Sequence, residues 1–448
     1  MESLKDIIKA VNGYAENLSH VSISGITTDS REDCSGKLFI PLKGVNFNGH
    51  DYIETALKKG AVAALSEKEL LHNSDKIIKV KDTLDAYGKI AKYFIERDKI
   101  KIIAITGTAG KTTVKELLKH VTGFKGTEKN FNNLIGVPKT ILENVFQDKK
   151  SDFLIMELGV NCKGEMEKLR DITTPEFVLI TNIGFGHLEG FGSVDDVFNE
   201  KLKIVYGNSN LEKCILNQSV FKKIEGKKNR NIFKLFGEEE GADTVLLSSV
   251  SDFEKGNFIE FSYKNEKLKI HSKLLGTFNA LNVLSVFLTA VELGFDKHEI
   301  ISKTETFKPV KMRCEVYKSE KGVRIINDCY NANFDSFKSA ITLFDSVNVI
   351  GKKYLVMGDM FELGDMSAEL HKQLGKIVSL TGIDYVLCYG DLTGNIVENI
   401  NGKSRFVKRF KNKSEITDFL NKNLKPEDAV LVKASRAVQF EEITEGIK

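Results

Sequence analysis

The residues with the clearest chemical meaning lie in the segment Lys101–Thr113, which reads KIIAITGTAGKTT. A short apolar strand leads there into a glycine-rich turn, and Lys111 and Thr112 follow the turn. Backbone N–H groups of such a turn bind phosphate oxygens, while the lysine reaches the terminal phosphates and the threonine hydroxyl reaches Mg2+. The sequence therefore predicts an ATP or GTP site. The common loop pattern has glycine where this chain has Ile105, so this loop is a variant that starts at Gly107.

Three further polar residues accompany apolar segments. Glu157 ends an apolar strand, where a carboxylate holds Mg2+ directly or through water, although a glutamate at a strand end is more often simply solvated. His187 lies in a glycine-dense loop and is either a ligand of a second metal ion or a hydrogen-bonded loop histidine. Lys201 borders the apolar stripe of a helix that Ser193 is expected to cap. A lysine there usually extends its amine to solvent, whereas a buried, uncompensated ammonium is costly and would indicate modification or pairing with a metal-bound group.

Several loops are rich in asparagine and glycine, and these are Asn46–Asp51, Asn130–Pro138 and Asp328–Asn333. Amide side chains suit hydrogen bonding to sugars, uracil or peptide groups. The same composition also occurs in ordinary turns, because asparagine and glycine adopt turn conformations easily. Composition alone leaves both interpretations open.

The elements that must position these residues fall into three predicted domains, residues 1–98, 99–308 and 309–448. The first mixes short strands and helices and is expected to be a small α/β domain. In the second, buried strands at Ile102–Thr106, Phe153–Glu157, Phe177–Asn182 and Lys213–Asn217 alternate with helices, which predicts a parallel sheet wrapped by helices. Thr244–Ile270 alternates like an antiparallel excursion, and Gly276–Leu293 is typical of a long apolar helix.

The third domain begins after a hinge expected near Pro309, since proline disfavours helix continuation. Four apolar strands in this domain each end in polar residues. Ligands of doubly wound sheets bind at the carboxyl ends of strands, so these four ends are expected to contribute to a site. The strands are Val323–Asp328, Tyr354–Asp359, Tyr385–Asp391 and Ala429–Ser435.

Bulk properties exclude several classes of protein. The 448 residues suit two or three domains with cores of their own, and a net charge of +3 without a basic tract gives no electrostatic footprint for nucleic acid. No long apolar run or signal-like N-terminus is present, so we expect a cytoplasmic protein without membrane insertion. The six cysteines are dispersed without a C-x-x-C pair, which is typical of a reducing compartment and argues against zinc or redox roles.

Taken together, these motifs resemble the Mur ligase family over nearly the whole chain. The family's variant phosphate loop, T-G-T/S-x-G-K-T/S, is matched by Thr106–Thr112. Further matches are Asn130–Pro138, Glu157–Asn161, His187–Ser193 and the segments Tyr330–Asn333 and Gly358–Gly364. The resemblance implies three domains: an N-terminal UDP-binding domain, a central P-loop ATPase domain and a Rossmann-like C-terminal domain that binds the amine substrate.

The implied activity is ATP-dependent amide formation between D-alanyl-D-alanine and a UDP-N-acetylmuramoyl tripeptide, through an acyl phosphate, in a cytoplasmic monomer. ATP and two Mg2+ ions are the implied cofactors. By the resemblance, Thr112, Glu157 and His187 serve the metal ions, and Lys201 is the lysine that the family carbamylates. The implied catalytic residues are Lys111, His187, Lys201 and Arg313.

The resemblance also assigns ligand contacts. The implied ATP-binding residues are Gly107, Thr108, Ala109, Gly110, Lys111, Thr112, Thr113, Asn279, Asn282, Arg313 and Asp328. The implied substrate-binding residues are Asp29, Ser30, Arg31, Asn46, Gly49, His50, Asn133, Tyr330, Asn331, Asn333, Asp359 and Glu362.

The chain departs from the family pattern at five positions. Phe278 replaces a histidine, Met312 a glycine, Phe334 a proline, Ala434 a glycine, and Lys203 a glutamate. None of the five is an implied metal or phosphate ligand. They concern the adenine side of the site and the substrate pocket of the third domain.

Overall fold

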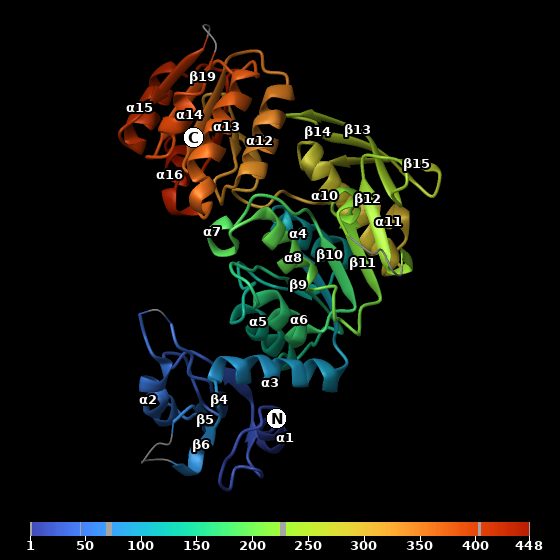
Figure 1. Ribbon diagram of the computed structural model, residues 1–448, viewed down its shortest axis with the longest axis vertical. Coiled ribbons are helices and arrows are strands. Elements are labelled where there is room, and N and C mark those ends of the chain that lie inside the picture. The colour runs from blue at the N-terminus through green and yellow to red at the C-terminus, as the bar shows by residue number, and fades with distance from the viewer. Residues whose placement is uncertain (1, 45, 69–73, 225–229, 402–404, 448) are drawn as a thin grey trace.

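The computed structural model describes residues 2–44, 46–68, 74–224, 230–401 and 405–447. Its elements form three α/β units arranged along the molecule, from the blue N-terminal unit through the green and yellow central unit to the red C-terminal unit (Figure 1). Each unit is built on a parallel or mostly parallel sheet of its own. The α/β fold with three units that we predicted is confirmed. The boundaries at residues 98 and 308 stay predictions.

The N-terminal unit has a four-stranded parallel sheet in the order β3-β4-β5-β6, with the antiparallel pair β1–β2 beside it. Its last helix, α3, also contacts α5 and α6 of the central unit, and Figure 1 shows it lying between the two units. The elements are β1 (Glu2–Ser3), α1 (Leu4–Ala10), β2 (Ser22–Ile23), β3 (Gly25–Thr27), β4 (Lys37–Phe39), α2 (Ile53–Lys58), β5 (Ala63–Ser66), β6 (Ile77–Lys79) and α3 (Thr83–Asp98).

The central unit has a nine-stranded sheet in the order β15-β14-β13-β12-β11-β10-β7-β9-β8. Strands β8 to β13 pair in parallel, and β13 to β15 form the predicted antiparallel excursion. The strands are β7 (Lys101–Thr106), β8 (Lys125–Gly126), β9 (Phe153–Glu157), β10 (Phe177–Ile180), β11 (Lys213–Asn217), β12 (Phe233–Gly237), β13 (Thr244–Asp252), β14 (Gly256–Tyr263) and β15 (Glu266–Ser272).

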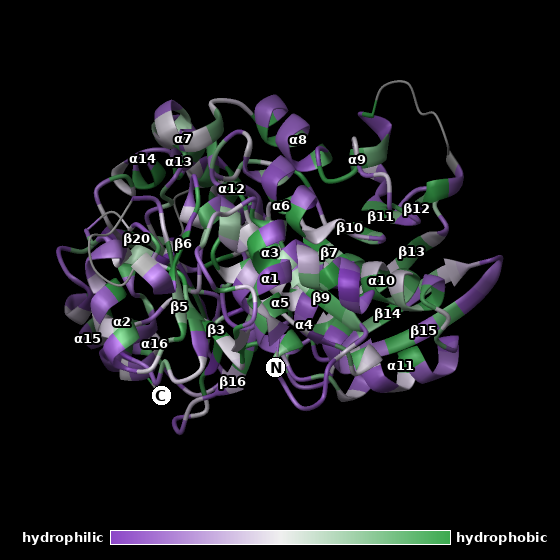
Figure 2. Cartoon of the chain, turned by 90° about the horizontal axis from the view of Figure 1, so that it is seen from below, coloured by the Kyte–Doolittle hydropathy of each residue, from purple (hydrophilic) through white to green (hydrophobic). Residues whose placement is uncertain are grey.

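Helices cover both faces of the central sheet because its strands are apolar on both sides. Ile102 and Ala104 of β7 pack into one core with α5, α6 and α8, whereas Ile103 and Ile105 pack into a second core with α4 and α10. Hydrophobic residues gather in the interior and hydrophilic ones line outer helices such as α8 (Figure 2). The helices are α4 (Lys111–Thr122), α5 (Gly136–Val145), α6 (Glu165–Thr173), α7 (Leu188–Phe191), α8 (Val194–Leu202), α9 (Gln218–Lys222), α10 (Thr277–Glu292) and α11 (Lys297–Thr306).

The C-terminal unit has a six-stranded sheet in the order β16-β17-β21-β18-β19-β20, in which β16 alone is antiparallel to its neighbour. The strands are β16 (Glu315–Lys318), β17 (Arg324–Asn327), β18 (Lys353–Gly358), β19 (Tyr385–Tyr389), β20 (Phe406–Arg409) and β21 (Ala429–Lys433). The helices are α12 (Phe334–Ser346), α13 (Ser367–Ser379), α14 (Gly394–Val397), α15 (Lys413–Asn423) and α16 (Glu441–Gly446).

The helices of this unit divide between the two faces of the sheet. Residues of α12, α13 and α14 belong to one core cluster, while those of α15 and α16 belong to another. The loops after β18 and β19 therefore turn to one face, and those after β20 and β21 turn to the other. Such a divergence opens a crevice at the carboxyl edge of the sheet, where ligands of this fold class bind.

The predicted strands and the long helix of the central and C-terminal units are confirmed within a few residues. Strands β12 and β20 were not predicted; β20 has three exposed residues among its four, so it carries no apolar run. Pro309, the expected hinge, lies in the irregular segment between α11 and β16. Among the described residues, no helix has both the length and the apolar character needed to cross a membrane.

Candidate active site between the central and C-terminal units

A pocket of about 400 Å3 lies where the central and C-terminal units meet. Most of the predicted site residues line it, although they come from segments far apart in the chain. These lining residues are Thr108, Ala109, Gly110, Lys111, Thr112, Thr113, Asn133, Glu157, His187, Asn279, Arg313, Asp328, Tyr330, Asn331, Asn333 and Glu362.

The glycine loop follows β7 directly and opens helix α4. Ile105 is still part of β7 and pairs with Leu179 of β10, so the turn begins only at Gly107. A Cβ at Gly107, which has φ 147°, would lie 2.0 Å from the Thr181 hydroxyl oxygen. Gly110 caps α4 at φ 83° and faces Asn282 of α10, whose Oδ1 would lie 2.7 Å from an added Cβ. Close packing and left-handed backbone thus explain both glycines.

The Lys111 amine folds back over the loop and donates a hydrogen bond to the Gly107 carbonyl oxygen at 2.9 Å. Burial lowers the pKa of Lys111, and the nearby Glu157 carboxylate opposes that change. Asn182 holds the outer part of the loop, because its Oδ1 accepts from the Ala109 N–H and its backbone carbonyl accepts from Thr108. The loop is therefore held in shape by protein contacts, with α4 behind it as a source of positive dipole.

Glu157 lies at the end of β9, where it is almost fully buried. Its backbone N–H donates to the Thr127 hydroxyl, and its Oε1 accepts from Asn132 Nδ2 at 2.9 Å. Its Oε2 is buried without a hydrogen-bond partner among the described residues. A buried carboxylate oxygen without a donor is costly, so this atom marks a place where a ligand or cation is needed.

Lys201 is 1% exposed on α8, and its Nζ has no hydrogen-bond partner among the described residues. Burial moves the pKa of its amine well below the ordinary value, and the charge of Lys111 lowers it further. The neutral amine is therefore favoured. Its neighbour Glu200 is engaged elsewhere, since it accepts from the N–H groups of Gly164 and Met166 and pairs with Lys203.

Arg313 reaches from the segment before β16 to the glycine loop, where its Nη2 donates to the Thr112 hydroxyl at 3.2 Å. Its guanidinium carbon lies 3.8 Å from the centre of the Tyr330 ring. Burial lowers the pKa of Arg313, and its Nε has no hydrogen-bond partner in the described parts of the chain. An oriented cation with a spare donor fits an anion in the pocket.

His187 and Glu362 join the two units across the pocket. His187 Nδ1 lies 2.7 Å from Glu362 Oε2, and the Glu362 carbonyl accepts from the Glu189 N–H. Both His187 and Glu362 have left-handed backbones, with φ values of 56° and 63°. Hydrogen bonding to His187 lowers the pKa of Glu362. The resemblance assigns the His187 imidazole to a metal ion, but in this structure its Nδ1 is engaged by the Glu362 carboxylate.

A second contact between the units involves the start of α12. Asp335 Oδ2 accepts from the Phe185 N–H at 2.7 Å, and burial raises the pKa of Asp335. The rings of Phe185 and Phe334 meet edge to face with centres 5.4 Å apart. Phe334 stands where the resemblance implies a proline, at the first position of α12, and Asn333 caps the helix. The replacement adds an aromatic contact across the pocket.

The residues implied for adenine and ribose are already engaged by the protein. Asn279 Nδ2 donates to the Leu275 carbonyl, and Asn282 Nδ2 donates to Asn279 Oδ1. Asp328 accepts from the Cys314 N–H and pairs with buried Lys433 at 2.6 Å. Asn282 and Gly107 do not line the pocket but support the loop that does.

Three of the implied substrate residues have structural partners as well. Asn333 Oδ1 accepts from the Ser336 N–H in a capping box, and Asn331 Oδ1 accepts from the adjacent Ala332 N–H. Asn133 likewise accepts from the N–H groups of Ile135 and Gly136 at the start of α5. Their amide nitrogens are the groups that remain for a ligand.

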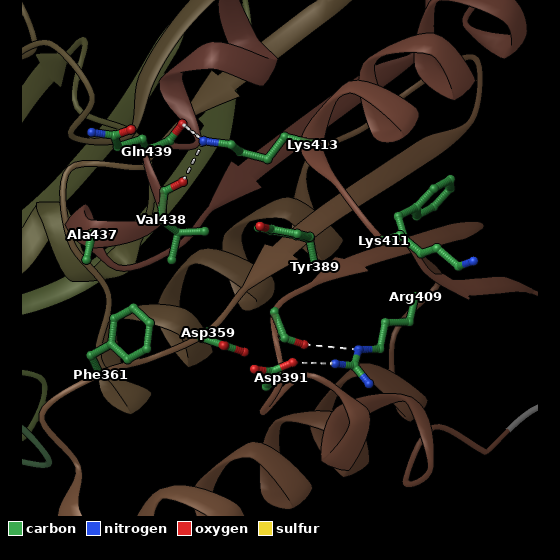
Figure 3. A pocket seen from close by; sticks show the side chains of 12 residues that line it. Asp359, Phe361, Tyr389, Asp391, Arg409, Lys411, Lys413, Ala437, Val438 and Gln439 are labelled. Carbon is green, nitrogen blue, oxygen red and sulfur yellow. Dashed lines mark hydrogen bonds and ion pairs between the residues drawn. The ribbon is translucent and has the colours of Figure 1, made fainter.

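Asp359 lies apart from the other predicted residues and lines a second pocket of about 690 Å3 in the C-terminal unit (Figure 3). Its Oδ1 accepts from the N–H groups of Leu392 and Thr393. Gly390 is required beside it, because a Cβ there would lie 2.4 Å from the Asp359 carboxyl carbon. The pocket occupies the crevice at the carboxyl edge of β18 to β21, and Phe361 lines both pockets.

The residues implied for the UDP sugar lie in the N-terminal unit. Arg31 pairs with both oxygens of Asp29 and holds the pKa of that carboxyl down to about 2. His50 Nδ1 bonds to Asn48, while its buried Nε2 has no hydrogen-bond partner among described residues. Ser30 and Gly49 are buried, whereas Asn46 is exposed. The described contacts bring none of these six residues to the interdomain pocket.

Comparison with known proteins places this geometry in context. Three family models match the chain: "Mur ligase family, catalytic domain" at residues 22–95, "Mur ligase middle domain" at 105–290, and "Mur ligase, glutamate ligase domain" at 312–436. UDP-N-acetylmuramoyl-tripeptide--D-alanyl-D-alanine ligase of Bacillus subtilis is 32% identical over 99% of this chain and 98% of that protein. The chain belongs to the Mur ligase family.

Solved structures agree with this membership of the Mur ligase family. MurF from Acinetobacter baumannii has a TM-score of 0.88 with 26% identity, covering 100% of this chain and 98% of that one. MurF ligase from Thermotoga maritima, solved in complex with ADP, has a TM-score of 0.83 with 28% identity, covering 94% and 96% of the two chains. The predicted family and fold class are confirmed.

The residues of this Mur ligase fit a divalent cation that is held mainly by nucleotide phosphates. No group of three or more histidine, cysteine, aspartate or glutamate side chains in the described structure would hold a metal ion by itself. One buried carboxylate oxygen, at Glu157, and one hydroxyl, at Thr112, are nevertheless placed beside the phosphate loop. Mg2+ commonly binds in this way, with one or two protein ligands, phosphates and water.

Met312 stands where the resemblance implies a glycine, and the structure shows why glycine would suit this position. Its φ is 59°, in the left-handed region, and Cys314 has φ 55°. A methionine there costs about 1 kcal/mol or more relative to glycine. The strained segment carries Arg313, so it aims the guanidinium at the loop.

The motifs missed several residues of this Mur ligase site. Asn132 was within a predicted segment but was not singled out, although it bonds directly to Glu157. Lys433 and Lys115 were not singled out either, yet both are fully buried beside site carboxylates. The available signal for Lys115 was its spacing of four residues from Lys111, which places both on one face of a helix.

Proposed function

We propose that this chain joins D-alanyl-D-alanine to a UDP-N-acetylmuramoyl tripeptide at the expense of ATP, through an acyl phosphate. The observation that carries the proposal is the interdomain pocket, in which a phosphate loop, a buried carboxylate and an arginine from the C-terminal unit meet. Full-length similarity to ligases of that name supports the choice of substrates. The proposal includes cytoplasmic location and a monomeric state.

The chemical problem is to bring two anions together. The tripeptide carboxylate must attack the γ-phosphate, which forms the acyl phosphate and releases ADP; the dipeptide amine then displaces phosphate and forms the amide. Lys111 and Arg313 supply positive charge beside the loop, and the α4 N-terminus adds its dipole. Two Mg2+ ions would add charge neutralisation at the phosphates, with Glu157, Thr112 and His187 as their protein ligands.

Lys201 is proposed to be carbamylated. Its buried amine favours the neutral form, which can add to CO2: an N–C bond forms, one proton leaves, and a carboxylate replaces the amine. The modification gives the orphaned Nζ a role and turns a cation into an anion in a site that binds metal. Glu362 would have to release His187 when metal and substrate bind.

The dipeptide is proposed to lie along Phe361, with its amine in the interdomain pocket and its carboxylate in the second pocket. Phe361 lines both pockets, and an extended dipeptide spans about 7 Å. The second pocket has Arg409, Lys411 and Lys413 in its lining for an anion, and Figure 3 shows Arg409 beside Asp391. Arg409 also donates to the Gly390 carbonyl oxygen. The carboxylate end of the dipeptide would then meet the basic residues of the second pocket, and its amine end would lie in the interdomain pocket.

The direct test is phosphate release from ATP with each combination of cosubstrates. We expect release that depends on both UDP-N-acetylmuramoyl tripeptide and D-alanyl-D-alanine and that does not occur with single amino acids. Turnover of ATP without either cosubstrate would instead indicate a regulatory or transport ATPase. Turnover with a different amine would indicate another amide ligase of the family. A panel of tripeptides that differ at the third residue would define the acyl substrate.

A further inference from the structure

Lys115 is a fully buried lysine of the phosphate-loop helix that the proposed reaction does not use. It lies one turn after Lys111 on α4 and is 0% exposed. Burying an ammonium is costly unless acceptors or opposite charges surround it. Its partners therefore show what it does.

The Lys115 amine lies between two carboxylates at unequal distances. Its Nζ is 2.9 Å from Glu116 Oε1, 3.4 Å from the Lys129 carbonyl oxygen and 3.8 Å from Glu157 Oε2. Glu116 is thus within hydrogen-bond distance, whereas the Glu157 oxygen feels the charge without a hydrogen bond. That oxygen is the buried Oε2 that has no hydrogen-bond partner among the described residues.

The other carboxylate oxygen of Glu157, Oε1, is fixed by the loop Asn130–Pro138. Asn132 Nδ2 donates to Oε1, and the carbonyl of Lys129, just before that loop, accepts from Lys115. Lys115 therefore contacts both the metal-side carboxylate and the segment that orients it. A change at Lys115 would reach Glu157 by two routes.

An alternating series of charges holds the lysine back from Glu157. Glu116 pairs with Lys115 on one side and with Lys119 at 3.4 Å on the other, and Lys119 pairs with Glu128 at 2.7 Å. The series runs from the buried site to the surface, where the Glu128 side chain is 68% exposed. Because Glu116 attracts the ammonium, Lys115 stays at a distance that orients Glu157 without closing on it.

Buried Lys433, which also lines the interdomain pocket, provides the contrast of a lysine whose amine is fully partnered by the protein. Its Nζ has three oxygen contacts, to Asp328 Oδ2 at 2.6 Å, the Asn331 carbonyl at 3.2 Å and the Asp328 carbonyl at 3.4 Å. The Asp328 carboxylate it pairs with has no orphaned oxygen in the described structure. Glu157, the carboxylate near Lys115, does keep such an oxygen, because its Oε2 has no hydrogen-bond partner among the described residues.

We propose that Lys115 is a positioning residue that stands in for a divalent cation at Glu157: it orients the carboxylate before the cation binds and opposes the cation once it is bound. The proposal rests on the assignment of Glu157 as a metal ligand under the proposed function. It predicts a split between affinity and rate. Removing the charge should tighten cation binding, since one repulsion is lost, yet slow the reaction, since Glu157 loses its orientation.

The experiment compares Lys115→Met with Lys119→Met in the full-length enzyme. Lys119 lies on the same helix and loses the same charge, but its partners are Glu116 and Glu128 on the surface side. Mn2+ binding in the presence of ADP is titrated by electron paramagnetic resonance, and kcat is measured at saturating Mg2+. For Lys115→Met we expect the Mn2+ dissociation constant to fall about threefold to tenfold and kcat to fall about tenfold or more. Lys119→Met should change each value less than twofold.

Two more variants keep the proposal falsifiable. Lys115→Arg retains the charge and should retain most of kcat with unchanged Mn2+ affinity. Lys115→Gln, measured in parallel in case the methionine variant does not fold, should tighten Mn2+ binding in the same direction. Weaker or unchanged Mn2+ binding in both uncharged variants would overturn the proposal.

A final variant separates this inference from the proposed function. Glu157→Gln should weaken Mn2+ binding at least tenfold if Glu157 is a metal ligand. Unchanged binding in Glu157→Gln would refute the metal assignment itself. Weaker binding in Glu157→Gln together with unchanged binding in the Lys115 variants would refute only the role of Lys115.

Discussion

The central and C-terminal sheets bring polar side chains to comparable carboxyl edges but treat them differently. Beside the central sheet, Glu157 Oε2, Lys201 Nζ and Arg313 Nε are buried without hydrogen-bond partners among the described residues. At the edge of the C-terminal sheet, Asp359 accepts from two N–H groups, and Lys433 has three oxygen contacts. One edge is incomplete without a ligand, and the other is largely satisfied by the protein.

This difference between the two edges indicates that the two units have different roles. Orphaned buried polar atoms lower stability, so they persist where a ligand completes them. Under the proposed function, the central edge is where the charged groups react, and the C-terminal edge positions a substrate. Both units have a mostly parallel sheet, and what distinguishes the two edges is how many of their buried polar atoms have hydrogen-bond partners.

The largest expected effect comes from Lys201→Ala, which removes an orphaned amine of the central edge. Loss of the proposed carbamate should reduce kcat about 10- to 100-fold, because groups that support a metal site contribute at that level. Ligation assays with added bicarbonate or short carboxylates should restore part of the activity. Activity close to that of the unaltered enzyme would contradict the carbamate.

For the free energy of unfolding, the larger effect is expected at the C-terminal edge and not at the central edge. Lys433→Met breaks a pair with Asp328 that is largely buried, and we expect the free energy of unfolding to fall by about 2–3 kcal/mol. Lys201→Met removes a buried amine that has no partner in the described structure, so the free energy should stay equal or rise. Urea denaturation of both variants measures the difference. Equal losses would show that the two lysines are equivalent.

Arg313→Met tests the group that bridges the two edges. Its guanidinium donates to Thr112 and keeps a spare Nε, and hydrogen bonds to charged groups contribute about 1.5–3 kcal/mol. KM for ATP should therefore rise about tenfold or more, while KM for the dipeptide changes little. Steady-state kinetics with each substrate varied in turn separates these values, and the reverse pattern would move Arg313 to the dipeptide side.

Lys411→Ala tests the second pocket, where the expected effect is smaller because the lysine is exposed. KM for D-alanyl-D-alanine should rise about two- to fivefold, in line with exposed charge pairs. Lys408→Ala is the control, since Lys408 lies three residues before Lys411, on β20, but does not line the pocket. An equal change in both variants would attribute the effect to general charge.

The smallest effect concerns pH and the contact between the units. Burial raises the pKa of Asp335 above its ordinary value of 3.8. Protonation of Asp335 therefore favours the docked arrangement, in which the central and C-terminal units are in contact at Phe185. The contribution is complete below pH 3.8 and is lost as the pH rises through the raised pKa of the docked state. Small-angle scattering across this range should show a slightly larger radius at higher pH. Asp335→Asn, which keeps an acceptor for Phe185, should remove that trend.

Apolar runs and glycine positions predicted the main strands and the loop correctly because these depend on nearby residues. The variant loop starts at Gly107 since Ile105 still belongs to β7, which agrees with the sequence pattern. Strand β20 escaped prediction because three of its four residues are exposed and it forms no apolar run. Asp359 was grouped with Glu362 by the motif they share, yet the two line different pockets.

The sequence by itself determined the family, the main strands of the central and C-terminal units, and the chemistry of the phosphate loop, since these follow from local spacing and from motif resemblance. Only the tertiary structure decided which charged groups have partners. The contact of Arg313 with Thr112 joins residues 201 positions apart, and Lys115, Lys201 and Lys433 are all buried lysines that differ only in their surroundings. Burial and pairing depend on the packing of distant segments, so residue type alone does not separate a positioning lysine from an orphaned or a structural one.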